Sequence, residues 1–206
     1  MGAVRIIFDE LMPVSYGQFY VNSDDDFLDL PAAFAGQENG LCGAAVAGGL
    51  FLITATHTGQ VRLRIELLDA EPAPAEAVWE EVVEAPFVPD GDGVWLQSWG
   101  GDDGWELDLG GHAAYRVRYC ATDMARCREV ERTDYDQPAR DRYLMQFWPV
   151  GDEASRPDAV LRQTSAQAAY WHGFAREQPP EAPPRSTPPP ASRAGGPAAA
   201  PRPTPR

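Results

Sequence analysis

Histidine and cysteine are the residues of this chain that could supply a nucleophile, an acid–base group or a metal ligand. His57, His112 and His172 have no partners at metal-ligand spacing, and no serine lies in a nucleophile-elbow motif. Six residues separate Cys120 from Cys127, which fits neither a zinc knuckle nor a redox pair. The sequence therefore predicts a protein that is not an enzyme, with no catalytic residue, no metal site and no cofactor.

Aspartate is the second chemically relevant group, because it gathers in segments that read as turns. These segments are Asp24 to Asp26, Asp90 with Asp92, and Asp102 with Asp103. Calcium requires six to eight oxygen ligands around one point, and the D-x-D-x-D-G motif is missing. Aspartate and glycine also suit tight turns for backbone reasons alone. A calcium- or ligand-binding β-sandwich module therefore remains an alternative to a surface that meets a protein partner.

Tryptophans cluster in the middle of the chain, where an exposed ring could serve as a protein hot spot or a carbohydrate platform. Trp79 and Trp95 lie in strand-like runs and are predicted to pack in the core. Trp99 precedes Gly100 and Gly101 in a turn and is predicted to be exposed. The predicted partner-binding residues are Asp24, Asp25, Asp26, Asp90, Asp92, Trp99, Asp102 and Asp103.

The charge of the chain indicates the kind of partner. The formal net charge is −14 with a pI near 4.5, which argues against a nucleic-acid-binding surface, since such surfaces are basic. Strong negative charge usually serves solubility, and less often it forms a surface that complements a basic protein partner. No apolar run is long enough to span a membrane, and the first residues do not resemble a signal peptide. With its three cysteines, the chain is predicted to be a reduced, cytoplasmic protein.

Two amphipathic strands organise the predicted fold. Residues 61–68 alternate apolar and polar side chains with a period of two, and residues 78–87 are rich in β-branched and aromatic residues. Within the second run, odd-numbered residues share one face, which places Trp79 with Val83 and Phe87. Residues 50–56 read as a buried strand that forms a hairpin with residues 61–68 across Thr58-Gly59.

Further short strands follow at regular intervals. They are predicted at residues 15–21, 94–98, 105–109, 115–120 and 143–149, with a short edge strand at 4–8, and glycine or aspartate turns separate several of them. This spacing is typical of an all-β, antiparallel β-sandwich, here jelly-roll-like. Helical periodicity occurs in residues 165–176, which begin at the cap candidates Thr164 and Ser165 and place Ala168, Trp171 and Ala175 on one face. The glycine-rich stretch 40–49 is expected to bring the backbone close to a neighbouring element.

The composition changes abruptly at residue 178, after which 11 of the 20 prolines occur. Residues 178–206 are therefore predicted to be a disordered tail rich in proline, alanine and arginine, and residues 1–177 the β-sandwich domain with its C-terminal helix. A scaffold whose proline-rich tail recruits other domains is a further alternative function.

A family resemblance is carried by several short motifs in residues 15–120. They are Ser15-Tyr16-x-Gln18-Phe19-x-Val21, Thr58-Gly59-x-Val61, Trp79-Glu80-x-x-Val83-Glu84-x-Pro86-Phe87, Gly93-x-x-Leu96-x-Ser98, Leu107 and Tyr115-Arg116. In order and spacing they resemble the competence protein J family, inhibitors of a DNA-entry nuclease. Residues 134–177 and the tail extend beyond the expected end of such a protein.

The resemblance implies an all-β fold and a nuclease-inhibitor type of function. It transfers no inhibitory residue to a position in this chain. An acidic inhibitor would occlude a nuclease because the active site of a nuclease is basic and holds phosphate.

Overall fold

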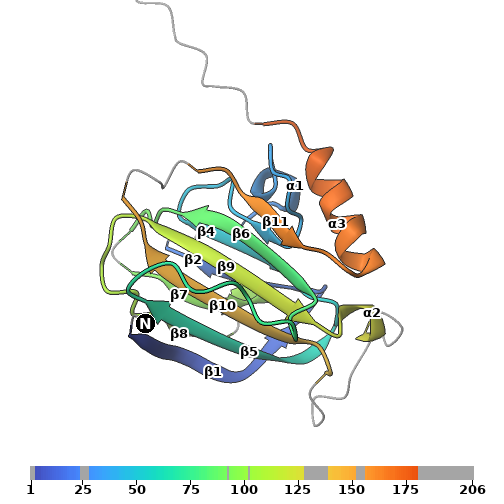
Figure 1. Cartoon of the computed structure of the whole chain (residues 1–206), viewed down its shortest axis with the longest axis horizontal. Helices are drawn as coiled ribbons and strands as arrows, with labels where there is room; N and C mark the ends of the chain where they lie inside the picture. The colour runs from blue at the N-terminus through green and yellow to red at the C-terminus, as the bar shows by residue number, and fades with distance from the viewer. Residues whose placement is uncertain are drawn as a thin grey trace, which may run out of the picture.

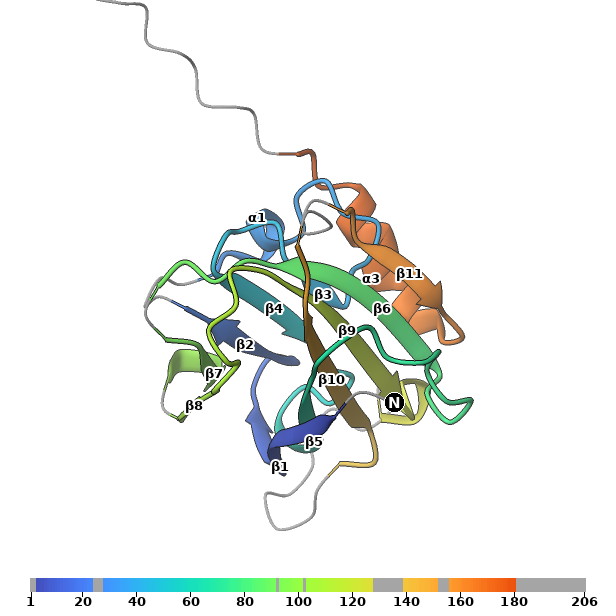
Figure 2. The same cartoon turned by 60° about the vertical axis from the view of Figure 1, so that its left-hand side comes forward.

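The computed structural model describes residues 3–23, 28–91, 93–101, 103–127, 139–151 and 156–180. Its strands form two sheets that lie one over the other (Figures 1 and 2). The six-stranded sheet, in spatial order, contains β1 (Val4–Val14), β5 (Gly59–Leu68), β10 (Arg142–Pro149), β9 (Tyr115–Thr122), β6 (Glu81–Phe87) and β11 (Ala159–Arg162). The five-stranded sheet contains β3 (Cys42–Gly43), β4 (Gly49–Ile53), β2 (Gln18–Asn22), β7 (Trp95–Ser98) and β8 (Gly104–Glu106). The helices are α1 (Leu30–Ala33), α2 (Met124–Cys127) and α3 (Ala166–Arg176), with a single 3-10 turn at Trp99–Gly101.

Both sheets contribute to one hydrophobic core, as the predicted alternation requires. In β5, Val61, Leu63 and Ile65 are buried in the core, whereas Arg62 is exposed. In β6, Val83 and Phe87 face the same core. The predictions of a mostly β protein and of a C-terminal helix are confirmed.

The expectation of purely antiparallel pairing is wrong at one position. Strand β10 lies between β5 and β9, and it runs parallel to β5 while pairing antiparallel with β9. Consequently β5 and β6, the two amphipathic strands of the sequence, are separated by β10 and β9. The local pattern determined which residues face the core but carried no information about a neighbour 80 positions later.

The predicted hairpin of residues 50–56 with 61–68 is also wrong, because β4 and β5 belong to different sheets. Residues 54–58 cross between the sheets and are held by groups from the start of β10. Asp141 accepts hydrogen bonds from the backbone N–H (3.0 Å) and the hydroxyl (2.7 Å) of Thr56, and the hydroxyl of Tyr143 accepts one from Ala55 N–H at 2.7 Å. These buried hydrogen bonds fix the path of residues 54–58, in place of the turn that a hairpin would need.

Two tryptophans lie outside the predicted core. Trp95 is 42% exposed, because the inward positions of β7 are taken by Leu96 and Ser98. Trp79 is half-buried in a turn before β6 begins, where Val78 is 48% exposed. It belongs to residues 69–80, the covering segment, which runs over the outer face of the six-stranded sheet and contacts β9 there, since Arg118 donates to Ala73 O at 2.6 Å.

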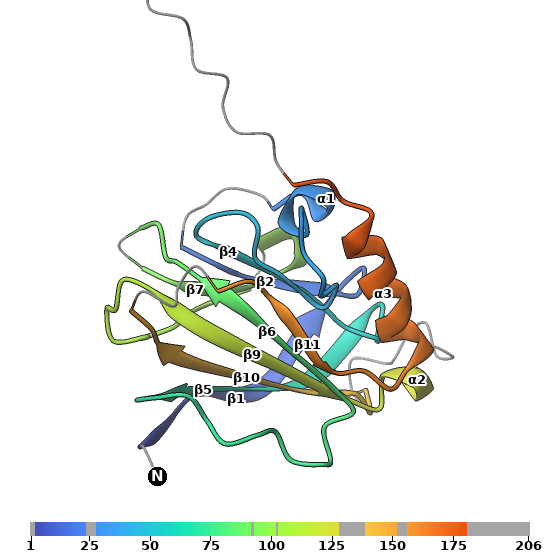
Figure 3. The same ribbon diagram turned by 45° about the horizontal axis from the view of Figure 1, so that its top comes forward.

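Helix α3 packs along the edge of the molecule beside β11 (Figure 3). Its N-cap is Ser165, whose hydroxyl accepts from Ala168 N–H at 3.1 Å, and Ala168 and Ala175 are fully buried, as predicted. Gly40 lies against its backbone, which confirms the close approach expected of the glycine-rich stretch. No helix in the described part of the chain is long and apolar enough to cross a membrane. Residues 181–206 of the predicted tail lie outside the described residues, whereas Gln178 accepts a hydrogen bond from Gly36 N–H at 3.0 Å.

The inward face of α3 carries a histidine that should make folding pH-dependent. His172 is buried, and its Nδ1 accepts from Gly40 N–H at 2.9 Å, so the ring is neutral with its proton on Nε2. Burial, reinforced by Arg176 and only partly opposed by Asp158, lowers the pKa of His172 to about 4. Because the unfolded chain binds this proton near pH 6.5, the free energy of unfolding should fall by about 2 kcal/mol between pH 7 and pH 5 through this group alone.

Urea titrations at both pH values measure this contribution as a difference between variants. His172→Gln keeps a polar group at the site and should reduce the pH dependence relative to the wild type. Equal pH dependence in the two proteins would contradict the assignment.

Candidate functional site

An exposed tyrosine lies at the turn between β1 and β2. Tyr16 and Gly17 both have positive φ, 58° and 69°, and an isolated bridge joins Ser15 to Gln18. A two-residue turn with both central φ values positive favours Asn-Gly, since side chains other than those of asparagine and aspartate are strained there. Tyr16 is 60% exposed despite this cost, and strain of this kind is concentrated at functional sites.

Two further aromatic rings meet Tyr16 at this turn. The ring centroid of Trp99 lies 4.7 Å from that of Tyr16, and the centroid of the exposed His57 lies 5.4 Å from it. Trp99 is 40% exposed and begins the loop between β7 and β8, in which Gly100 and Gly101 adopt positive φ. A backbone hydrogen bond joins the two segments that carry Tyr16 and His57, since Gly17 N–H donates to His57 O at 2.9 Å.

A shallow depression of about 360 Å³ adjoins the aromatic rings. It is lined by Pro13, Val14, Ser15, Gln60, Ser98, Trp99 and Asp103. Asp103 is exposed, and its backbone is fixed by two hydrogen bonds to Ser98. We call Tyr16, His57, Trp99 and Asp103 the tip surface; it combines aromatic area with a carboxylate and lies where the β7–β8 hairpin projects from the molecule (Figure 2).

The structure brings together only part of the predicted partner-binding set. Trp99 and Asp103 line the same depression. Asp90 is exposed at the opposite end of β2, where its backbone N–H donates to Ser23 Oγ at 2.8 Å. The five residues of β2 separate these ends by about 16 Å. Asp24, Asp25, Asp26, Asp92 and Asp102 lie outside the described residues.

Sequence reasoning missed Tyr16 and His57 as members of the surface. Tyr16 was assigned to a strand by its aromatic character, although a bulky residue directly before Gly17 was the available signal of a strained turn. His57 carried no signal, because the crossing that exposes it depends on contacts with Asp141 and Tyr143.

Acid–base and thiol chemistry have little support in the described residues. Cys42, Cys120 and Cys127 are free and buried. Burial raises the pKa of the Cys120 thiol to about 12 and that of Cys127 to about 11, so neither forms a thiolate near neutral pH. Within the described ranges, no group of three histidine, cysteine, aspartate or glutamate side chains could hold a metal ion.

Comparison with known proteins gives similarity at the level of the fold. No family model matches the chain, and no curated protein matches it. Among solved structures, the product of crocagin biosynthetic gene J is 13% identical with a TM-score of 0.50, and the match covers 72% of this chain and 99% of that one. ComJ from Bacillus subtilis, described as an inhibitor of the DNA-degrading activity of NucA, is 17% identical with a TM-score of 0.49 over the same shares of the two chains.

Proposed function

We propose that this chain is a non-enzymatic binding protein that occludes a basic protein partner, and that the partner is a nuclease. The observation that carries the proposal is the tip surface. Its exposed rings, Tyr16 and Trp99, lie next to an exposed carboxylate, on a backbone turn that stores strain. Aromatic side chains dominate the energetics of protein interfaces because they bury a large area at low entropic cost.

Charge supports the choice of partner. The chain has a net charge of −14, so its field attracts a basic surface and repels a nucleic acid. A nuclease binds phosphate with cationic residues, and Asp103 beside Trp99 would meet such residues as the rings pack against the rim of the site. The aromatic rings would supply affinity, and the negative electrostatic field of the chain would supply fast association with a basic partner.

Three of the motifs that resemble competence protein J contribute residues at or beside the tip surface. Ser15 and Ser98, from two separate motifs, line the same depression. A third motif contributes Thr58, whose hydroxyl lies 2.9 Å from Nδ1 of His57. These motifs are distant in sequence, and their convergence on one exposed surface supports a nuclease-inhibitor type of role. The three reduced cysteines support a cytoplasmic location as part of the same proposal.

The test is binding to, and inhibition of, a nuclease from the same organism. Trp99→Ala should weaken binding about 30- to 100-fold, the loss typical of a hot-spot aromatic residue. Trp95→Ala is the matched control, since Trp95 is 42% exposed on the same sheet but lies at the other end of β7. If the wild type inhibits none of the organism's nucleases, or if the two tryptophan variants behave alike, the proposal is wrong.

A second variant separates binding from folding. Tyr16→Asn removes the ring but places a residue that tolerates positive φ at the strained position, so the melting temperature should be unchanged or higher. Binding should nevertheless weaken at least about 10-fold. Tyr170→Ala, which truncates a tyrosine of equal exposure on α3, should leave binding unaltered.

A further inference from the structure

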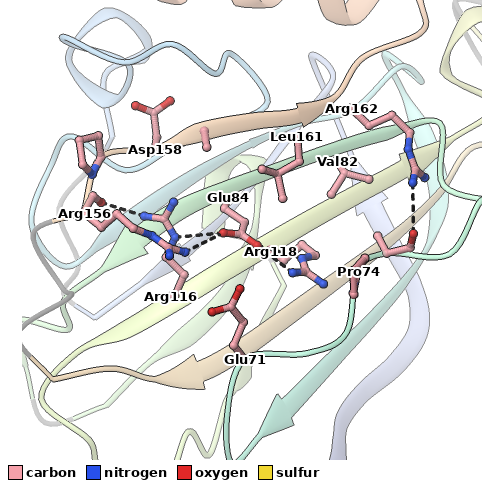
Figure 4. A pocket seen from close by; sticks show the side chains of 13 residues that line it. Glu71, Pro74, Val82, Glu84, Arg116, Arg118, Arg156, Asp158, Leu161 and Arg162 are labelled. Atoms are coloured by element: carbon pink, nitrogen blue, oxygen red, sulfur yellow. Dashed lines mark hydrogen bonds and ion pairs between the residues drawn. The ribbon is translucent and has the colours of Figure 1, made fainter.

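Four of the 17 arginines line one pocket on the outer face of the six-stranded sheet (Figure 4). The pocket lies between β6, β9 and β11 on one side and the covering segment on the other, and its volume is about 590 Å³. Arg116, Arg118, Arg156 and Arg162 point into it. This arginine pocket gathers positive charge in a chain whose net charge is −14.

A single carboxylate lies at the centre of three of these guanidinium groups. Glu84 Oε1 accepts from Nε and Nη2 of Arg118 at 3.0 and 2.9 Å. Glu84 Oε2 accepts from Nε of Arg116 at 3.4 Å and from Nη2 of Arg156 at 3.1 Å. Glu84, Arg116 and Arg118 are all more than nine-tenths buried, so solvent screens these charges weakly.

Two of the four arginines hold the covering segment. Arg118 also donates to Ala73 O at 2.6 Å and lies over the Trp148 ring. Arg162 donates to the backbone carbonyls of Ala75, Glu76 and Trp79. These contacts account for Arg118 and Arg162 as structural residues.

Arg116 and Arg156 are different, because they retain donor capacity. Arg116 Nη1 donates to Arg156 O at 2.8 Å, while Nη2 of Arg116 has no acceptor among the described residues. Burial lowers the pKa of Arg116, and the neighbouring charge of Arg156 lowers it further. The charge of an anion placed between the two guanidinium groups would oppose both effects.

The other carboxylates of the pocket do not fill this position. Asp158 Oδ2 is occupied by the backbone N–H groups of Glu38 and Asn39, at 3.0 and 2.6 Å. Glu71 is exposed on the covering segment and forms no ion pair with a described arginine. Around Glu84, the buried guanidinium groups of Arg116 and Arg118 and the partly exposed one of Arg156 are opposed by Glu84 itself and by the nearby charge of Asp158. Positive charge is thus in excess there, and buried charge is costly unless it is compensated.

The part of the pocket wall beyond Glu84 carries two apolar side chains. Val82 is buried, and Leu161 is 54% exposed even though it lines the pocket. We propose that the arginine pocket binds a small molecule whose carboxylate or phosphate group is held by Arg116 and Arg156 and whose apolar body lies on Leu161 and Val82. The volume falls in the range of small-molecule sites, and paired guanidinium groups suit the planar or tetrahedral oxygens of such anions. This site is separate from the tip surface and does not depend on the nuclease proposal.

The test uses three probes with the same hexyl body: heptanoate, hexyl phosphate and hexanol. Each is titrated into the full chain at low ionic strength, with amide chemical shifts and melting temperature as readouts. At least one anion should bind with a Kd at or below about 1 mM and shift the amides of Val82 and Leu161. The anion that binds more tightly identifies the preferred head group, carboxylate or phosphate. Absence of saturable binding by both anions, or hexanol binding as tightly as they do, would overturn the proposal.

Variants then assign the binding to the pocket. Arg156 is 43% exposed, so Arg156→Gln should fold normally while weakening the bound anion at least about 10-fold. Arg142→Gln removes the same charge from an exposed position on β10 and should leave the affinity unchanged. Equal weakening by both variants would mean that the anion responds only to net charge, which would also overturn the proposal.

Discussion

Replacing Gly40 by alanine is expected to displace helix α3 and to lower the free energy of unfolding by about 3–5 kcal/mol. A Cβ atom at Gly40 would lie 1.9 Å from the carbonyl oxygen of Trp171 and 2.1 Å from its carbonyl carbon. These are backbone atoms of a helix, so no side-chain rotation can relieve the overlap. The helix must move away, which breaks the hydrogen bond from Gly40 N–H to His172 and loosens the buried Ala168 and Ala175.

Urea unfolding followed by circular dichroism measures the loss. The control is Gly173→Ala on the same helix, where an added Cβ meets nothing within 4 Å. That variant should gain about 0.5–1 kcal/mol, because alanine is the better helix former. A loss below about 1 kcal/mol for Gly40→Ala would contradict the direct contact between the glycine-rich stretch and α3.

The second large effect is expected at Glu81, which joins β6 to the start of α3. Its carboxylate is fully buried and accepts from Thr164 N–H, from Thr164 Oγ1 and, at 2.7 Å, from Ser165 N–H. It therefore lies at the N-terminus of the helix, where a negative charge is favourable. Glu81→Ala leaves the buried Ser165 N–H without an acceptor and removes the acceptor of two groups of the exposed Thr164, so it should cost about 2–4 kcal/mol.

A graded series distinguishes this role from simple loss of packing. Glu81→Gln retains one acceptor oxygen of nearly the same shape and should cost about 1–2 kcal/mol. Glu76→Ala, which removes an exposed carboxylate from the covering segment, should change stability by less than about 0.5 kcal/mol. If the glutamine variant is as unstable as the alanine variant, charge at the helix end matters more than hydrogen bonding.

Local sequence patterns predicted most of the strands and helices, but not which strands pair with one another. The alternation in residues 61–68 identified the core face of β5, and the cap at Ser165 placed the start of α3 correctly. The pairing of β5 with β10 and the crossing at residues 54–58 were not predictable in this way. Both depend on Asp141, Tyr143 and the strand that follows them, whose contacts span about 80 residues.

The same distinction applies to the sites. The glycines after Trp99 correctly predicted an exposed ring, because a turn of that composition cannot be buried in a sheet. The arginine pocket was hidden because Arg116 and Arg118 occupy outward positions of β9, which normally face solvent. Only the covering segment, whose backbone carbonyls are bound by Arg118 and Arg162, turns that face into a pocket.

The central position of β10 has a consequence for how the protein is made. Strands β5 and β9 gain their shared neighbour only when residues 142–149 have left the ribosome. Until then the edges of both strands remain open, and open strand edges invite pairing with other chains. Pairing across such a long separation is also slow, because loop-closure entropy must be overcome before the contacts form. We therefore expect the nascent chain to depend on chaperones until β10 is inserted, and the finished domain to unfold as one cooperative unit.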